Sequence, residues 1–128
     1  MKMKKEAVST TKAPQAIGPY SQAIRAGGFL FVSGQIPLDP ESGKIVGSSI
    51  ESQTEQVMKN LSAILESQKL DFSAVVKTSV FLIDMGEFPR FNEVYQKHMK
   101  TPYPARATVQ VSRLPKDVLV EIELIAQL

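Results

Sequence analysis

Two segments near the C-terminal end of the chain alternate in polarity with a period of two residues. They span residues 105–112 and 118–127, and successive side chains of a strand point to opposite faces of a sheet. One side of the first segment carries Arg106, Thr108, Gln110 and Ser112. One side of the second is wholly apolar, with Val118, Val120, Ile122 and Leu124. The alternation predicts two strands and restricts the chain to folds that contain a sheet.

The loop between these strands decides which side chains lie together. If residues 113–116 form a four-residue hairpin loop, Arg106 lies opposite Glu123 and Thr108 lies opposite Glu121. A five-residue loop shifts the register by one and moves the glutamates to the face opposite Arg106. We predict the first register, because it places both apolar sides in the core and buries no charge.

An arginine, a threonine and two carboxylates on one half-buried sheet face have two interpretations. They could be cross-strand ion pairs that fix the register, or contacts at the rim of an oligomer interface. Alternatively, Arg106 binds a carboxylate ligand and a nearby glutamate handles water. Spacing alone leaves both interpretations open.

Turn residues and hydrophobic periodicity predict the first half of the chain. Residues 17–26 and 29–33 indicate two strands that meet at Gly27-Gly28, and residues 36–47 indicate a loop. A helix follows, and its start fits a capping box at either Ser48 with Glu51 or Ser52 with Glu55. The apolar stripe of this helix consists of Ile50, Val57, Leu61, Ile64 and Leu65.

The second half adds a buried strand over residues 75–84 and a second helix. Pro89 suits the first turn of that helix, and its apolar stripe consists of Phe88, Phe91, Tyr95 and Met99. The order ββαβαββ predicts an α+β fold with two helices on one face of the sheet. The other face must then be polar, or it must be buried by another copy of the chain.

Composition excludes several kinds of chemistry. The chain has no Cys, which removes thiol nucleophiles and thiolate metal sites, and His98 is its single His. A two-histidine mechanism within one chain is therefore impossible, and we expect no metal. The 15 basic and 13 acidic residues give a formal charge of +2, so we expect no nucleic-acid partner.

A length of 128 residues fits one domain, spanning 1–128. Residues 1–12 carry Lys2, Lys4, Lys5 and Lys12, and we interpret them as a partly flexible basic tail. No apolar run is long enough for a secretory signal or a membrane span. We therefore expect a cytoplasmic protein without a membrane partner.

Five separated motifs occur between about Thr10 and the C-terminus. They are Ile17-Gly18-Pro19-Tyr20, Ser33-Gly34-Gln35-Ile36-Pro37, Val76-Lys77-Thr78-Ser79-Val80-Phe81, Pro104-Ala105-Arg106, and Arg113-Leu114-Pro115-Lys116-Asp117 leading to Glu121-Ile122-Glu123. Together they resemble the RidA family, also called the YjgF or liver perchloric-acid-soluble protein family. The resemblance implies a chorismate-mutase-like single domain with a mixed sheet, assembled as a homotrimer with clefts between subunits.

The resemblance also implies an activity. Archetypal members hydrolyse the reactive enamines 2-aminoacrylate and 2-aminocrotonate, and their imine tautomers 2-iminopropanoate and 2-iminobutanoate. The products are 2-oxo acids and ammonia, and no cofactor or metal is needed. By the resemblance, Arg106 grips the substrate carboxylate, Glu121 orients or deprotonates the attacking water, and Tyr20 closes one wall of the cleft.

Further residues are expected to bind substrate. By the resemblance, Ser33 and Gly34 line the pocket through their backbone, and Asn92 reaches it from the second helix. Among the aromatic residues of that helix, Phe88 is our candidate for contact with the cleft. Thr108 stands where many members carry Cys, and its hydroxyl can still donate a hydrogen bond.

Two other functions compete with the deaminase. One is a non-catalytic regulatory protein that binds 2-oxo acids in the same cleft. The other is an endoribonuclease or translation inhibitor, an activity ascribed to some family members. A single His and a charge of only +2 make the RNA-directed function the weaker alternative.

Overall fold

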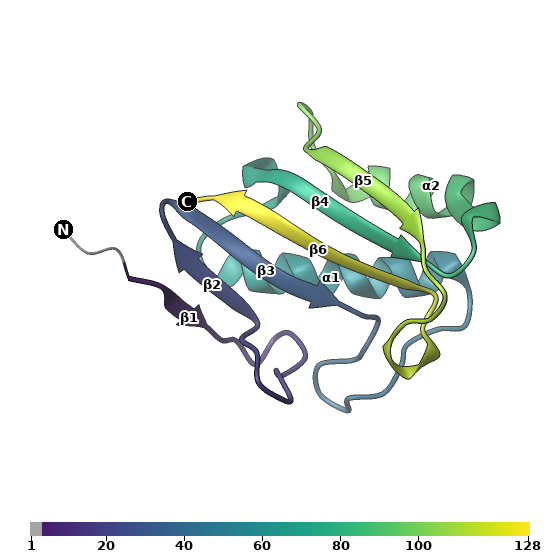
Figure 1. Cartoon of the computed structure of the whole chain (residues 1–128), viewed down its shortest axis with the longest axis horizontal. Helices are drawn as coiled ribbons and strands as arrows, with labels where there is room; N and C mark the ends of the chain where they lie inside the picture. The colour runs from purple at the N-terminus through teal and green to yellow at the C-terminus, as the bar shows by residue number, and fades with distance from the viewer. Residues whose placement is uncertain (1–3) are drawn as a thin grey trace.

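The computed structural model describes residues 4–128, and Figure 1 shows one sheet with both helices behind it. The strands are β1 (Glu6–Val8), β2 (Ala23–Ala26), β3 (Phe29–Gln35), β4 (Val75–Leu82), β5 (Ala105–Gln110) and β6 (Val120–Gln127). The helices are α1 (Ile50–Ser67) and α2 (Phe88–His98), with short 3-10 turns η1 (Phe72–Ala74), η2 (Met85–Glu87) and η3 (Pro115–Asp117). The order is the predicted one with β1 added.

The order of the strands in the sheet overturns the predicted C-terminal hairpin. The strands lie in the order β1-β2-β3-β6-β4-β5, so β6 pairs with β3 and β4, and β5 is an edge strand. Neighbouring strands are antiparallel except β4 and β5, which are parallel and connected through α2. A parallel pair needs such a crossover. Neither proposed hairpin register exists.

Burial explains these positions in the sheet. Strand β6 alternates strictly, and its side facing the helices consists of Val120, Ile122, Leu124 and Ala126, each at most 3% exposed. A strand with such a side suits the centre of the sheet. Strand β5 is exposed at most of its residues, as an edge strand can be.

The N-terminal segment contains a strand that the sequence prediction missed. Glu6–Val8 pairs with β2, and Val8 is 4% exposed, so this part of the predicted tail is anchored. Three residues are too few to display a period of two. Lys4, Lys5 and Lys12 are exposed, and Lys2 lies outside the described residues. The strand predicted over residues 17–26 shrinks to β2.

The N-cap of helix α1 is Ser49, one residue after the first predicted start and three residues before the second. Its hydroxyl accepts from the backbone N–H of Ser52 at 3.1 Å, and the Ser52 hydroxyl accepts from the Ser49 N–H at 3.2 Å. Both predicted capping boxes are wrong, because a serine here closes the box in place of glutamate. The predicted apolar stripe is buried, which confirms the helix and its face. Pro89 lies in the first turn of α2, as predicted.

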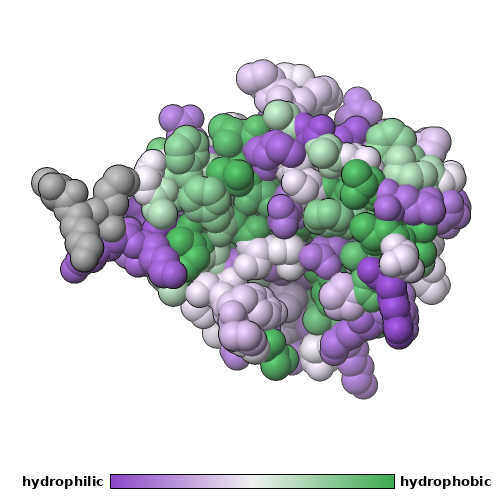
Figure 2. Space-filling view, viewed as in Figure 1, coloured by the Kyte–Doolittle hydropathy of each residue, from purple (hydrophilic) through white to green (hydrophobic). Residues whose placement is uncertain are grey.

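The face of the sheet opposite the helices is open and partly apolar. Phe31 is 44% exposed and Val109 is 46% exposed there, and Figure 2 shows hydrophobic surface spread over this face. The predicted faces hold for β6 but not for β5. Ala107 and Val109 lie on the open side, whereas Arg106 and Thr108 lie in register with Thr78 and Val80, whose side chains are buried toward the helices.

Candidate functional site

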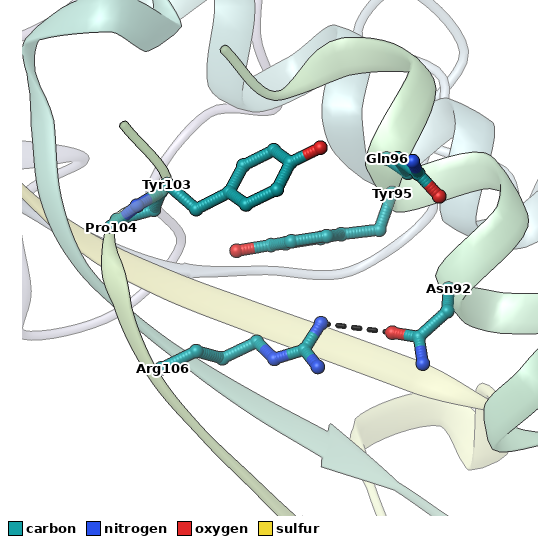
Figure 3. Close-up of a pocket in the computed structure, with 6 residues that line it drawn as sticks. All are labelled: Asn92, Tyr95, Gln96, Tyr103, Pro104 and Arg106. Atoms are coloured by element: carbon teal, nitrogen blue, oxygen red, sulfur yellow. Dashed lines mark hydrogen bonds between the residues drawn. The ribbon is translucent and has the colours of Figure 1, made fainter. Parts of the chain in front are cut away.

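An arginine lies at the edge of the sheet beside helix α2, next to a cavity of about 500 Å³. We call this cavity the arginine pocket. Its lining consists of Asn92, Tyr95, Gln96, Tyr103, Pro104 and Arg106, all drawn in Figure 3. Helix α2 supplies three of these residues, and the segment entering β5 supplies the others.

The guanidinium of Arg106 is held by helix α2. Its Nη1 donates to Asn92 Oδ1 at 2.9 Å (Figure 3). Its central carbon lies 5.0 Å from the centre of the Tyr95 ring and 5.3 Å from that of Phe88, which is cation–π distance. A guanidinium has five N–H donors, and Asn92 is its one hydrogen-bond acceptor among residues 4–128. The N–H groups of Arg106 that do not bond Asn92 can bind a carboxylate with two parallel hydrogen bonds.

Tyr95 is a site residue that the sequence reasoning assigned only to the core. Its hydroxyl lies 2.8 Å from Thr78 Oγ1 on β4, in a buried contact. Burial raises the pKa of Tyr95, while the Thr78 hydrogen bond and the charge of Arg106 oppose the rise. The phenol therefore stays neutral at physiological pH. Its position one turn after Asn92 on the same helix is the sequence signal that could have placed it beside Arg106.

A second, wider cavity of about 1030 Å³ lies on the other side of the sheet. We call it the carboxylate pocket. Its lining includes Tyr20, Ser33, Gly34, Lys116, Glu121 and Glu123. Four of the predicted site residues are thus together here. Tyr20 lies at the rim and is 52% exposed. The Ser33 hydroxyl donates its proton to the Ser21 carbonyl at 2.6 Å, so that proton is not available to a ligand.

Glu121 is half-buried on the open side of β6. Burial raises the pKa of its carboxyl, and the negative charge of Glu123 raises it further. Gly34 on β3 leaves the space that this carboxylate occupies, because a Cβ built on Gly34 would overlap Glu121 Oε2. A raised pKa makes this carboxylate a stronger proton acceptor than a fully exposed glutamate.

The two pockets lie on opposite faces of one sheet. Phe81 is the β4 partner of Glu121, and Thr78 is the β4 partner of Arg106. Residues 78 and 81 are separated by an odd number of positions, so their side chains point to opposite faces. The prediction that Arg106 and the glutamates share one side is therefore wrong, and so is the expected Arg106–Glu123 ion pair. Within one chain, the pattern of side chains was read correctly on β6 and incorrectly on β5.

Thr108 lies on the side of Arg106 rather than opposite Glu121. Its partner on β4 is Val80. Its hydroxyl is buried and makes no hydrogen bond with residues 4–128. The predicted cross-strand contact with Glu121 is wrong, while proximity to Arg106 along β5 holds.

Other titratable groups do not join either pocket. His98 Nε2 lies 3.0 Å from a carboxylate oxygen of Glu55, so it links α2 to α1. Among residues 4–128, no three His, Asp or Glu side chains are grouped to hold a metal ion. No helix in this part of the chain is long and apolar enough to cross a membrane.

Fold and pockets together define a class: small α+β proteins with an arginine pocket and a carboxylate pocket on opposite faces of one mixed sheet. Residues 10–128 match the family described as Endoribonuclease L-PSP. The chain therefore belongs to this family, which is the YjgF/RidA family of the sequence resemblance. Membership confirms the predicted α+β fold, which is consistent with a chorismate-mutase-like arrangement.

Individual relatives are similar over nearly the whole chain. Reactive Intermediate Deaminase A, chloroplastic, from Arabidopsis thaliana is 52% identical over 98% of this chain and 67% of the relative. A candidate regulator named AldR from Lactococcus lactis is 54% identical over 94% of this chain and 95% of the relative. The crystal structure of E. coli TdcF with bound serine has a TM-score of 0.90, at 41% identity over 96% of this chain and 98% of that one.

Proposed function

We propose that this protein is a deaminase that hydrolyses 2-iminopropanoate and 2-iminobutanoate, with their enamine tautomers 2-aminoacrylate and 2-aminocrotonate, to 2-oxo acids and ammonia. The observation that carries the proposal is the state of Arg106: two aromatic rings and Asn92 hold its guanidinium, and most of its donors remain free beside a cavity. That arrangement suits the carboxylate of a small amino-acid derivative. The deaminase name of a relative with 52% identity supports the same activity.

We further propose that a complete site forms between two subunits of a homotrimer. Arg106 and Glu121 cannot reach one ligand within a chain, because the sheet lies between them. A neighbouring chain that covers the open face can bring its own Glu121 to this Arg106. The exposed apolar side chains of that face favour such a contact. In a closed ring of three chains, each interface then carries one site.

The proposed reaction needs little equipment. Arg106 and Asn92 fix the carboxylate, which orients the imine carbon toward the carboxylate pocket of the neighbouring chain. Glu121 accepts a proton as the water oxygen bonds to the imine carbon, and it returns this proton to the nitrogen to give a carbinolamine. The hydroxyl proton of the carbinolamine then moves to the nitrogen as the C–N bond breaks, so that ammonia leaves and a C=O bond remains. An enamine enters the same route after protonation at its carbon. General base catalysis of this kind is typically worth roughly 10²–10⁴-fold.

The other proposed site residues line the two pockets or contact Arg106. Tyr20 closes one wall at the rim, and the backbone of Ser33 and Gly34 lines the side that carries Glu121. Phe88 lies against the guanidinium of Arg106 and helps to hold its position, while Thr108 has a hydroxyl without a hydrogen-bond partner among residues 4–128, further along the same strand. No cofactor is part of this proposal.

A second candidate is a regulatory protein that binds 2-oxo acids without turnover. The name of the L. lactis relative favours it. The position of Glu121 in the carboxylate pocket favours the enzyme, because binding of a 2-oxo acid through Arg106 needs no proton acceptor. An endoribonuclease, which the family description names, is the third. His98, the single histidine, is bonded to Glu55 and lines neither pocket.

The test couples a pyridoxal-phosphate-dependent threonine dehydratase to the purified protein and follows 2-oxobutanoate. We expect faster formation of the 2-oxo acid, abolished by Arg106→Ala and strongly reduced by Glu121→Gln. Binding of 2-oxobutanoate without acceleration would favour the regulatory protein, and cleavage of RNA without either would favour the nuclease. Sedimentation should show three chains per particle, and cell fractionation should find the protein in the cytoplasm, where we place it.

A further inference from the structure

A buried hydrogen bond lies directly behind the arginine pocket and takes no part in the proposed chemistry. It joins Thr78 on β4 to Tyr95 on α2, with 2.8 Å between the two hydroxyl oxygens. Thr78 is 1% exposed and Tyr95 is 7% exposed. This contact ties the sheet to the helix at the level of Arg106.

Thr78, Tyr95 and Arg106 are in pairwise proximity. Thr78 is the register partner of Arg106 across β4 and β5. Thr78 bonds the hydroxyl of Tyr95, and the ring of Tyr95 lies 5.0 Å from the guanidinium carbon of Arg106. Figure 3 shows the ring extending from α2 above the guanidinium, with Asn92 at the other side of the fork. Thr78 therefore contacts both the strand that carries Arg106 and the Tyr95 ring that the guanidinium of Arg106 packs against.

We propose that Thr78 and Tyr95 are positioning residues for Arg106 and thereby set the affinity for the substrate carboxylate. The Thr78 hydroxyl is buried and bonded to the phenol of Tyr95, so it gives that phenol a fixed partner on β4. This hydrogen bond holds the phenol end of Tyr95 in place, so the face of the ring stays against the guanidinium of Arg106. This inference rests on the proposed function, since it concerns how Arg106 meets the carboxylate of the ligand.

A merely structural bond and a positioning bond make different predictions for paired variants. Thr78→Val and Tyr95→Phe each leave one buried hydroxyl without a partner, so each single variant should melt at a lower temperature. Thr78→Val with Tyr95→Phe removes both hydroxyls, and stability should return close to that of the wild type. If the bond positions the ring, affinity should stay low in the double variant even though stability has returned.

The experiment measures 2-oxobutanoate binding by calorimetry and melting temperature on the same preparations of full-length protein. We expect each single variant and the double variant to bind about tenfold more weakly. Thr78→Ser keeps a hydroxyl at this position and should restore affinity to within about twofold of the wild type. Wild-type affinity in Thr78→Val, or recovery of affinity together with stability in the double variant, would overturn the inference.

Failure of the proposed function gives a separate pattern. If the wild-type protein neither binds 2-oxobutanoate nor hydrolyses the imine, the proposed function and this inference fall together. If the wild type does both and the variants bind equally well, only the positioning role of Thr78 and Tyr95 is refuted.

Discussion

Gly34 offers a precise way to move the proposed water-activating group. Gly34 lies in β3 where the register with β6 shifts between Val32 and Gln35, and its φ is outside the left-handed region, so the backbone does not disfavour an alanine there. Its new Cβ would overlap Glu121 Oε2 and would lie 2.9 Å from Cδ and 3.2 Å from Cγ of that side chain. Ordinary contacts are 3.4–4 Å. The carboxyl group must therefore retreat by about 0.5 Å at Cδ and by somewhat more than about 1 Å at Oε2, which its flexible side chain permits.

The catalytic effect of this displacement should be large and its effect on stability small. A misplacement of about 1 Å in a catalytic group can cost roughly 10²-fold in rate. We therefore expect Gly34→Ala to lower imine hydrolysis about 100-fold in the coupled dehydratase assay. The free energy of unfolding should change by less than about 1 kcal/mol, because losing a glycine also restricts the unfolded chain.

A background without the carboxylate provides the control. In Glu121→Gln protein, Gly34→Ala should cause little further loss of activity, since the group it displaces is already disabled. If Gly34→Ala keeps wild-type activity, or if it lowers the rates of wild-type and Glu121→Gln protein by the same factor, the role we give to the Glu121 carboxylate is refuted.

Three further predictions concern the charged groups. Arg106→Ala should weaken 2-oxobutanoate binding by roughly 100-fold, or about 3 kcal/mol, and Arg106→Lys should restore only part of it because an ammonium lacks the planar fork; calorimetry that finds full recovery with Lys would contradict this. Glu123→Gln removes a negative charge that raises the pKa of Glu121, so the acidic limb of the pH–rate profile should move to lower pH. An unmoved or upward-shifted limb counts against that coupling. The pKa of Glu121 is higher in the folded chain than in the unfolded one, so its contribution to stability is present below the unfolded pKa and lost as pH rises through the folded pKa. Glu121→Gln should therefore raise the melting temperature near pH 7 but not near pH 4, and equal effects at both pH values would show that this account is wrong.

Local patterns in the sequence predicted the elements well. Period-two alternation found β5 and β6, and the apolar stripes found both helices. These signals depend on neighbours within a few residues along the chain. They also predicted the core side of β6 correctly, because a continuous row of aliphatic residues must be buried against the helices.

Local sequence patterns did not predict the order of the strands in the sheet. A hairpin between β5 and β6 is the simplest connection of two consecutive strands, but the α2 crossover had already fixed β5 parallel to β4 at the edge. The assumption that apolar sides meet helices then failed for β5, because the open face is itself apolar at Val109. Arg106 consequently points to α2, where aromatic rings and Asn92 replace the expected glutamate.

The sequence also predicted single residues of the site better than the contacts between elements that are far apart in the chain. The family resemblance identified Arg106, Asn92, Glu121 and Gly34, and the structure assembles them into two groups. It also adds Tyr95 and its partner Thr78, whose contact joins β4 to α2. No spacing within one element could reveal that contact, because it depends on how the helix lies across the sheet.

The most direct test of the account asks whether two chains share one site. Arg106→Ala subunits, which we expect to be inactive, and Glu121→Gln subunits, which we expect to be strongly impaired, are unfolded together in equal amounts, refolded and assayed for imine hydrolysis. A site that takes Arg106 from one chain and Glu121 from its neighbour is intact in about a quarter of the random interfaces. We predict recovery of roughly a quarter of wild-type activity. A refolded mixture no more active than the separate variants, while refolded wild-type protein regains full activity, would contradict the shared site.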